Sequence, residues 1–259
     1  MSTFLFPIAL TPQMVLLVAI GVFLASFVDG IAGGGGIISV PAYLLAGLPA
    51  HLALGTNKLS SAIGTSVSTA RFIRNGYVDW KLALPAILLA ILGSHFGTRL
   101  QLAVDERYLK YMLLLVLPIV AFVVMRQRSL PEKRGDIAAG SQMAIVLAAS
   151  LIVGAYDGFY GPGTGTFLIL IYCKLAKLDL RTASGNTKLV NLSSNIGALF
   201  TSLMHGKVFL GLGLIGAIFS IAGHYIGSGL AIKDGSKIVR PAILTVLILL
   251  TIKVVVELI

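Results

Sequence analysis

Two lysines, Lys58 and Lys188, lie inside apolar segments of this 259-residue sequence, where an ammonium group is costly to bury. Such a lysine normally faces a cavity or a partner, although it can also extend to the nearest membrane surface. Both lysines follow hydroxyl and amide side chains, which can donate hydrogen bonds to the oxygens of an anion. These neighbours are Thr56, Asn57, Asn186 and Thr187. The recurrence of the pattern favours an anion-binding site.

Two glycine clusters, Gly33 to Gly36 and Gly161 to Gly165, form a second candidate element. Glycine interrupts helices and lets the backbone approach a ligand closely. The helix expected after each cluster presents free N–H groups and the positive end of its dipole, and both attract anions. Close packing of helices is the alternative use of these glycines. The residues expected to contact the anion here are Gly34, Gly35, Gly163 and Thr164.

Four titratable side chains are candidates for proton coupling. Asp29 and Asp157 precede the two glycine clusters, at the breaks between apolar segments. Each could instead cap the following helix or pair with a lysine. His95 and His224 lie one position apart when the halves are aligned, and each could relay protons or hydrogen-bond to a neighbouring helix. Further polar residues extend the lysine faces at helical spacing: Ser60, Ser61, Thr65, Asn191, Ser194 and Asn195.

The lysine motifs belong to an internal repeat with an offset of 130 residues. Gly55-Thr-Asn-Lys-Leu-Ser60 matches Gly185-Asn-Thr-Lys-Leu-Val190, and the Gly93–Gly97 segment matches Gly223–Gly227. The Asp-Gly pairs before the glycine clusters match at an offset of 128 residues. Internal duplication is common in secondary transporters. The sequence therefore indicates two homologous halves.

The composition excludes a soluble domain. The chain is 57% hydrophobic and 12% charged, with a mean hydropathy of +0.95, whereas soluble domains average about 25% charged residues. The net charge of +10 does not indicate nucleic-acid binding, because the basic residues lie between apolar segments. Cys173 is expected to serve packing. No catalytic set or metal-ligand spacing is recognisable, so we expect neither an enzyme nor a cofactor.

The distribution of basic residues predicts the topology. If each glycine-broken pair of segments enters and leaves on the same side, thirteen of the eighteen lysines and arginines outside the lysine motifs fall on one side and five on the other. The positive-inside rule then makes both termini extracytoplasmic. We expect a first transmembrane repeat (1–126), a cytoplasmic linker (127–137) and a second transmembrane repeat (138–259). Charge alone leaves open whether the broken pairs are re-entrant or fully spanning.

The expected fold is therefore an all-α polytopic membrane protein. Its two homologous halves form an inverted-topology repeat, and each half has a glycine-broken helical hairpin plus three transmembrane helices. Apolar segments at 108–125 and 238–259 provide the last helix of each half. We expect a secondary transporter for a small anion in the cytoplasmic membrane, with an anion channel as the alternative. The lipid bilayer is the expected partner, and the sequence leaves homo-oligomer formation open.

The same motifs resemble those of the TauE/SafE sulfite exporter family of membrane permeases. The resemblance rests on Phe27–Gly36, Gly55–Ser60, Gly161–Gly165 and Gly185–Leu189, in that order, and covers nearly the whole chain. It implies transport of sulfur-containing anions such as sulfite, sulfoacetate or other organosulfonates. Family members vary in substrate and direction, so the resemblance implies the substrate class more than one ligand.

Overall fold

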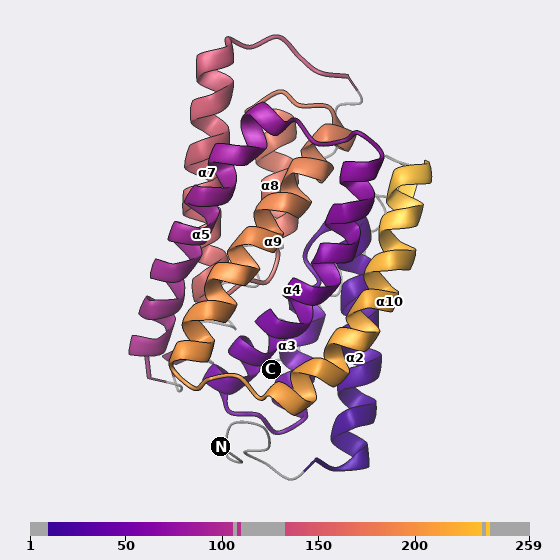
Figure 1. The fold of residues 1–259 in the computed structure, drawn as a ribbon, viewed down its shortest axis with the longest axis vertical. Helices are drawn as coiled ribbons and strands as arrows, with labels where there is room; N and C mark the ends of the chain where they lie inside the picture. The colour runs from indigo at the N-terminus through magenta and orange to yellow at the C-terminus, as the bar shows by residue number, and fades with distance from the viewer. Residues whose placement is uncertain (1–9, 106–107, 110–132, 235–236, 239–259) are drawn as a thin grey trace, which may run out of the picture.

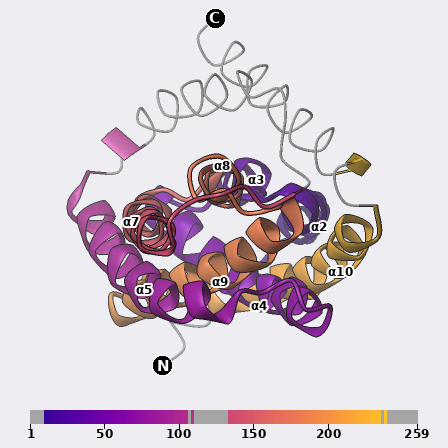
Figure 2. The ribbon, with the colours of Figure 1, turned by 90° about the horizontal axis from the view of Figure 1, so that it is seen from above.

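The computed structural model describes residues 10–105, 108–109, 133–234 and 237–238. These residues form eight helices and no strand: α2 (Pro12–Ala32), α3 (Gly36–Leu45), α4 (Ala50–Arg74), α5 (Trp80–Ala103), α7 (Ala139–Phe159), α8 (Thr164–Lys174), α9 (Leu180–Met204) and α10 (Leu210–Asp234). Seen from above, α5, α9, α4 and α10 form one layer, and α7, α8, α3 and α2 form a second layer (Figure 2). The expected segments at 108–125 and 238–259 lie outside the described residues.

A helical hairpin opens each half, as the glycine clusters predicted. The first hairpin joins α2 to α3 through Gly33 and Gly34, which have φ values of 73° and 101°. The second joins α7 to α8 through Gly161 and Gly163, with φ values of 97° and 88°. These positive φ values are readily adopted only by glycine, which explains why glycines occupy the turns.

The second helix of each hairpin is too short to cross a bilayer. α3 has 10 residues and α8 has 11, which corresponds to about 15–17 Å, whereas the hydrocarbon core is about 30 Å thick. The apolar segment 34–50 is longer than α3 because the helix ends at Leu45 and the chain turns at Gly47, whose φ is 88°. Both glycine turns therefore lie within the bundle, and α3 and α8 fold back along α2 and α7 (Figure 1).

The helices that carry the two lysine motifs run in opposite directions. α4 and its counterpart α9 are antiparallel, so the 75–79 loop lies at the upper end of the bundle and the equivalent 205–209 loop at the lower end (Figure 1). Each half also packs against the other. Helix α5 of the first half packs on α7 of the second, and α10 of the second half packs on α2 of the first. Each half thus covers the hairpin of the other, and the repeats form a single bundle.

Glycines permit these contacts between the halves. A Cβ atom placed on Gly93 of α5 would lie 2.9 Å from the backbone nitrogen of Ala155 in α7. A Cβ atom on Gly223 of α10 would lie 2.6 Å from the carbonyl oxygen of Phe23 in α2. The matching glycines of the repeat therefore have matching functions, because each lets the backbones of two helices approach closely.

Four of the described helices are long and apolar enough to cross a membrane: α2, α5, α7 and α10. α4 and α9 have 25 residues each but are more polar, because they carry the two lysine motifs. α5 presents an exposed apolar stripe at intervals of four residues, which suits contact with lipid. The stripe consists of Leu84, Leu88, Leu92, Phe96 and Leu100.

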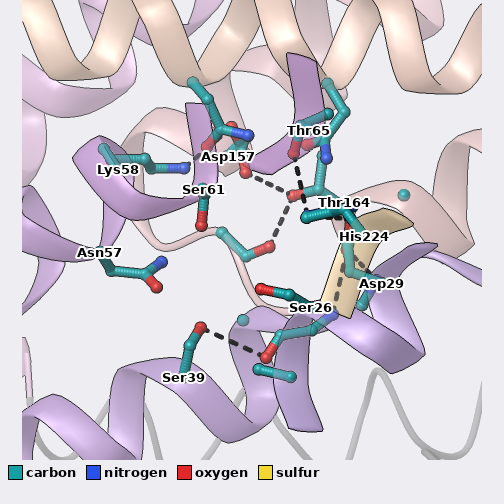
Figure 3. A pocket seen from close by; sticks show the side chains of 18 residues that line it. Ser26, Asp29, Ser39, Asn57, Lys58, Ser61, Thr65, Asp157, Thr164 and His224 are labelled. Carbon is teal, nitrogen blue, oxygen red and sulfur yellow. Dashed lines mark hydrogen bonds and ion pairs between the residues drawn. The ribbon is translucent and has the colours of Figure 1, made fainter. Parts of the chain in front are cut away.

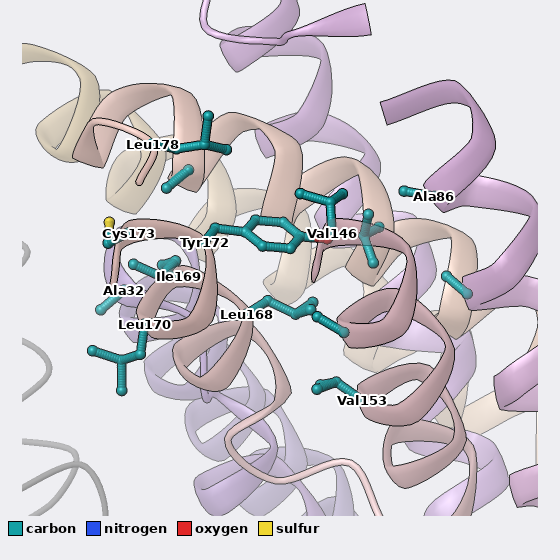
Figure 4. Close-up of a cluster of buried hydrophobic side chains, with 14 of the residues drawn as sticks. Ala32, Ala86, Val146, Val153, Leu168, Ile169, Leu170, Tyr172, Cys173 and Leu178 are labelled. Atoms are coloured by element: carbon teal, nitrogen blue, oxygen red, sulfur yellow. The ribbon is translucent and has the colours of Figure 1, made fainter. Parts of the chain in front are cut away.

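A buried apolar cluster packs around α8 and fixes the second hairpin (Figure 4). Leu168, Ile169 and Tyr172 of α8 are fully buried, and Val146 of α7 packs in the same cluster. The hydroxyl of Tyr172 lies 2.8 Å from the Oγ of Ser150, which satisfies its polar group. Cys173 is buried here as well, in line with the expected packing role.

Candidate functional site

A polar cavity lies where the two glycine turns meet the two lysine helices (Figure 3). Its empty volume is about 410 Å³ when the open space at its mouth is included. The lining comes from both halves: Ala25, Ser26, Asp29, Gly34, Gly35, Gly36, Ser39, Asn57, Lys58, Ser61, Thr65, Asp157, Gly161, Thr164, Gly165, Asn191, Asn195 and His224. Eleven of these eighteen residues belong to the first half, so the first half contributes more of the lining than the second.

The first lysine pairs with the aspartate of the opposite half. Lys58 Nζ lies 2.8 Å from Asp157 Oδ2, and both side chains are almost fully buried. Asp157 Oδ2 also accepts a hydrogen bond of 2.7 Å from Ser194, and its Oδ1 accepts one of 2.8 Å from Thr164. The carboxylate is therefore held by one ammonium and two hydroxyl groups.

The second lysine makes the reciprocal pair. Lys188 Nζ lies 3.4 Å from Asp29 Oδ2 and also donates to the backbone carbonyl of Asp29. His224 Nε2 lies 3.7 Å from the same carboxylate oxygen and 3.4 Å from the hydroxyl of Thr65. Of the two lysines, only Lys58 lines the cavity, since Lys188 is 1% exposed and covered by Asp29.

The first glycine turn donates its N–H groups to a side chain of the protein. Asp29 Oδ1 accepts hydrogen bonds from the backbone nitrogens of Gly34 and Gly35, at 2.9 and 3.1 Å. Asp29 therefore both caps α3 and pairs with Lys188, as one of the sequence alternatives stated. In the second turn, Gly163 adopts the left-handed conformation immediately before α8, and the Thr164 hydroxyl reaches Asp157.

The two turns contact each other at the centre of the bundle. A Cβ atom on Gly33 would lie 2.5 Å from the backbone of Gly165, so neither position has room for a side chain. The hydroxyl of Thr166 donates to the carbonyl oxygens of Ala32 and Gly33, at 3.2 and 2.9 Å. Movement of one hairpin would therefore be transmitted directly to the other.

The remaining residues expected at the site divide into two groups. Asn57 lines the cavity, and its Oδ1 has no hydrogen-bond partner among the described residues. Thr56 accepts a hydrogen bond from the backbone nitrogen of Phe209, and Asn186 accepts one from that of Asp79, so both join their helices to loops outside the cavity. Thr187 is fully buried and is not part of the lining.

The two histidines expected at the site lie in different places. His224 faces the cavity, whereas His95 Nδ1 lies 2.8 Å from the Thr201 hydroxyl and is absent from the lining. The sequence reasoning missed Ser26 and Ser39, the two serines that the first hairpin contributes. Their spacing could have revealed them, since Ser26 lies about one helical turn before Asp29 and Ser39 about one turn after Gly35.

The four charged groups at the centre compensate each other. Lys58 and Asp157 form one pair and Lys188 and Asp29 the other, so the two pairs carry no net charge while His224 is neutral. Such a centre can hydrogen-bond an oxyanion through Lys58, serine hydroxyls and asparagine amides. Among the described residues there is no group of three or more histidine, cysteine or acidic side chains that could hold a metal ion.

The chain matches the family model described as Sulfite exporter TauE/SafE over residues 17–254. It is 35% identical to "Probable membrane transporter protein ORF9" of Sinorhizobium sp. over 90% of this chain and 89% of that protein. It is 33% identical to a "Probable membrane transporter protein" of Haemophilus influenzae over 90% of this chain and 91% of that protein. "Probable membrane transporter protein YfcA" of Escherichia coli is 35% identical over 86% of this chain and 82% of its own length.

No solved structure matches the chain significantly. The family match spans both hairpins, both lysine helices and the cavity between them, so it confirms the resemblance inferred from the motifs. This chain belongs to the TauE/SafE sulfite exporter family, and it is an integral membrane protein of a transporter family.

Proposed function

We propose that the protein is a secondary transporter that moves a small sulfur-containing anion, such as sulfite or an organosulfonate, across the cytoplasmic membrane. The observation that carries the proposal is the central cavity, where Lys58, Asn57 and several hydroxyl groups converge on two broken hairpins. A sulfur oxyanion presents several acceptor oxygens, and this wall supplies an ammonium group and neutral donors for them. The family description, sulfite exporter, supports the same substrate class.

Alternating access would follow from the repeat. In this structure most residues that line the cavity belong to the first half. Lys58 lines the cavity, whereas Lys188 is buried outside it. If the two halves exchange conformations, Lys188 would line the equivalent cavity on the other side, as inverted repeats allow. The expectation that both lysines contact the anion then applies to the transport cycle rather than to one state. Thr56, Asn186 and Thr187 remain proposed contributors in that second state.

The proposed orientation places the upper end of the bundle in Figure 1 in the cytoplasm. That end carries the C-terminal ends of α4 and α10 and the N-terminal ends of α5 and α9, where most of the basic residues expected inside are found. The positive-inside rule supports this placement, with both termini outside. Reporter fusions at the C-terminus would test it, and a cytoplasmic C-terminus would contradict the inverted-topology repeat.

Flux measurements in proteoliposomes test the transport function. Sulfite, thiosulfate, sulfoacetate, taurine and sulfate would be offered outside vesicles containing the purified protein, with empty vesicles as the control. We expect saturable uptake that is accelerated by unlabelled substrate inside, because a carrier returns faster when loaded. Unitary currents in planar bilayers without counter-transport would show instead an anion channel. No flux of any of these compounds would contradict both.

A further inference from the structure

We propose that the cavity takes up its anion together with one proton, and that Asp157 holds this proton while the anion is bound to Lys58. The inference rests on the proposed function and deepens it, because it identifies the coupling ion and the group that carries it. The proton comes from water on the side to which the cavity is open. No covalent bond is made or broken.

The charge balance is the first argument. The two ion pairs leave the centre neutral, so a monovalent anion that entered alone would add one uncompensated negative charge in a buried site. Burying an unpaired charge in a membrane protein is strongly unfavourable. A proton on Asp157 removes one negative charge and frees Lys58 to pair with the anion. The loaded centre is then as neutral as the empty one.

The position of the lysines indicates which pair opens. Lys58 and Asp157 both line the cavity, so an anion can replace the carboxylate at Lys58. Lys188 does not line the cavity, and its ammonium is held by both the carboxylate and the backbone carbonyl of Asp29. The Lys188–Asp29 pair therefore stays closed in this state.

The hydrogen-bond partners indicate which carboxylate accepts the proton. Asp157 is held by the hydroxyls of Thr164 and Ser194, and each hydroxyl has a second acceptor: Gly161 O at 2.7 Å for Thr164 and Asn191 O at 3.0 Å for Ser194. If Asp157 gains a proton, it can donate to either hydroxyl, which then donates to that carbonyl. No hydrogen bond is lost, because a hydroxyl both donates and accepts.

Asp29 lacks this freedom. Its Oδ1 accepts from the backbone N–H groups of Gly34 and Gly35, and backbone N–H groups can only donate. A proton on Asp29 would weaken the cap of α3 and leave Lys188 without its charged partner. The two aspartates are equivalent in the repeat, but of the two only Asp157 accepts hydrogen bonds from two hydroxyl groups, which suit both protonation states.

The charged and titratable groups around Asp157 are few. Lys58 of α4 contacts it directly, and Asp29 of α2 and His224 of α10 share the cavity wall. From α9 comes Lys188, which is paired with Asp29. The helices α5 and α8 contribute the hydroxyls of Thr98 and Thr164, and His95 of α5 contacts Thr201. Lys58 is therefore the only one of these charged groups that contacts Asp157.

A second observation supports an anion-binding position beside Lys58. Asn57 is 6% exposed, it lines the cavity, and its Oδ1 has no partner within the described part of the chain. Buried polar groups almost always have a hydrogen-bond partner, so Asn57 is available to bind a ligand in the cavity. The amide can turn so that its NH₂ group faces an anion on Lys58.

Proton counting on the purified protein tests the proposal. Methanesulfonate is a suitable probe, because its sulfonate group does not titrate near neutral pH. It would be added to weakly buffered protein with a pH indicator, and affinity would be measured between pH 5 and pH 9. We expect about one proton taken up per anion and, by linkage, an affinity that falls ~10-fold per pH unit.

Asp157→Asn is the variant and His95→Gln its control, because His95 is titratable but contacts Thr201 away from the cavity. Asp157→Asn should bind the anion without proton uptake and with no pH dependence, because Lys58 is permanently free. His95→Gln should keep the wild-type proton count. If Asp157→Asn does not fold, the number of protons that the wild-type protein takes up per anion still tests the inference. Anion binding without proton uptake would overturn the inference but leave the proposed transport function intact. Proton uptake that survives in Asp157→Asn and disappears in His224→Gln also overturns it. If wild-type protein binds no anion of the transport panel, the proposed function fails and the inference with it.

Discussion

The two lysine–aspartate pairs have the same residues at equivalent positions of the repeat, yet their surroundings differ. Asp157 is held by two hydroxyl groups beside an exposed cavity wall, whereas Asp29 is held by two backbone N–H groups and lies near an imidazole. Both pairs join the two halves of the molecule. The comparison shows that the repeat provides two similar ion pairs, and that the neighbouring residues give the two aspartates different hydrogen-bond partners.

Two aligned positions contribute to this difference. Gly64 of the first half corresponds to Ser194 of the second, and Ser94 of the first corresponds to His224 of the second. A Cβ atom on Gly64 would lie 2.0 Å from Ser220 Oγ and 2.6 Å from His224 Cδ2, so the glycine makes room for both of these side chains of α10. In the second half, Ser194 occupies that place and donates to Asp157. The exchange is coupled, because the glycine and the histidine depend on each other.

The largest effect is expected on stability, from removal of the covered lysine. Lys188→Ala leaves Asp29 buried without its charged partner, and breaking a buried pair costs about 3–5 kcal/mol. The double variant Lys188→Met with Asp29→Asn removes both charges and should recover most of the loss. Denaturant unfolding in mixed micelles would measure both. Equal loss in the single and double variants would show that the pair itself is not the cause.

Removal of the cavity lysine should act mainly on binding. Lys58→Ala removes a contact to a charged ligand, worth about 1.5–3 kcal/mol, or ~10- to 100-fold in anion affinity. Lys58→Arg should also weaken binding, because the planar guanidinium differs in shape from the ammonium. Equilibrium binding of methanesulfonate would measure the change, with Lys58→Ala/Asp157→Asn as a control that leaves no unpaired carboxylate. Wild-type affinity in all three variants would move the anion site away from Lys58.

The coupled exchange can be tested by making the first half resemble the second. Gly64→Ser places atoms against His224 and Ser220, and overpacking of this kind costs about 1–3 kcal/mol. His224→Ser should relieve the contact with the imidazole but not the one with Ser220, so the double variant should recover part of the stability lost in Gly64→Ser. A double-mutant cycle on the unfolding free energies measures this coupling. Additive effects would mean that Gly64 is not required by the imidazole.

The sequence predicted the elements of the site better than their connections. The glycine turns follow from the residue type, because positive φ values require glycine, and the lysine helices follow from the repeat. The hydrogen bonds from Gly34 and Gly35 to Asp29 are local and were one of the alternatives considered. The pairing of Asp29 with Lys188 joins residues 159 positions apart. Only the packing of one half against the other determines that partner.

The lining of the cavity was also only partly predictable. The sequence placed Thr56 and Asn57 together because they are neighbours, but helix geometry turns them in different directions, toward Phe209 and toward the cavity. Successive residues on a helix lie about 100° apart, so the three polar residues of the first motif do not all face the cavity in this structure. The direction of each residue depends on where the partner helices lie, which spacing alone does not give.

The smallest effects are expected from the two histidines, and their difference sharpens the comparison between the halves. His224→Gln removes an imidazole that faces the cavity near Asp29 and Thr65, and loss of one neutral hydrogen bond costs about 0.5–1.5 kcal/mol, or ~2- to 10-fold in affinity. His95→Gln should leave both the affinity and the pH dependence of uptake unchanged, because His95 contacts Thr201 away from the cavity. Glutamine keeps a polar group at each position. The two variants therefore show whether the effect of losing an imidazole depends on its position in the bundle. Initial uptake rates across a pH series in proteoliposomes would measure both variants. A change of pH profile in His95→Gln with none in Asp157→Asn would assign proton coupling to the outer helix α5 instead of the central cavity.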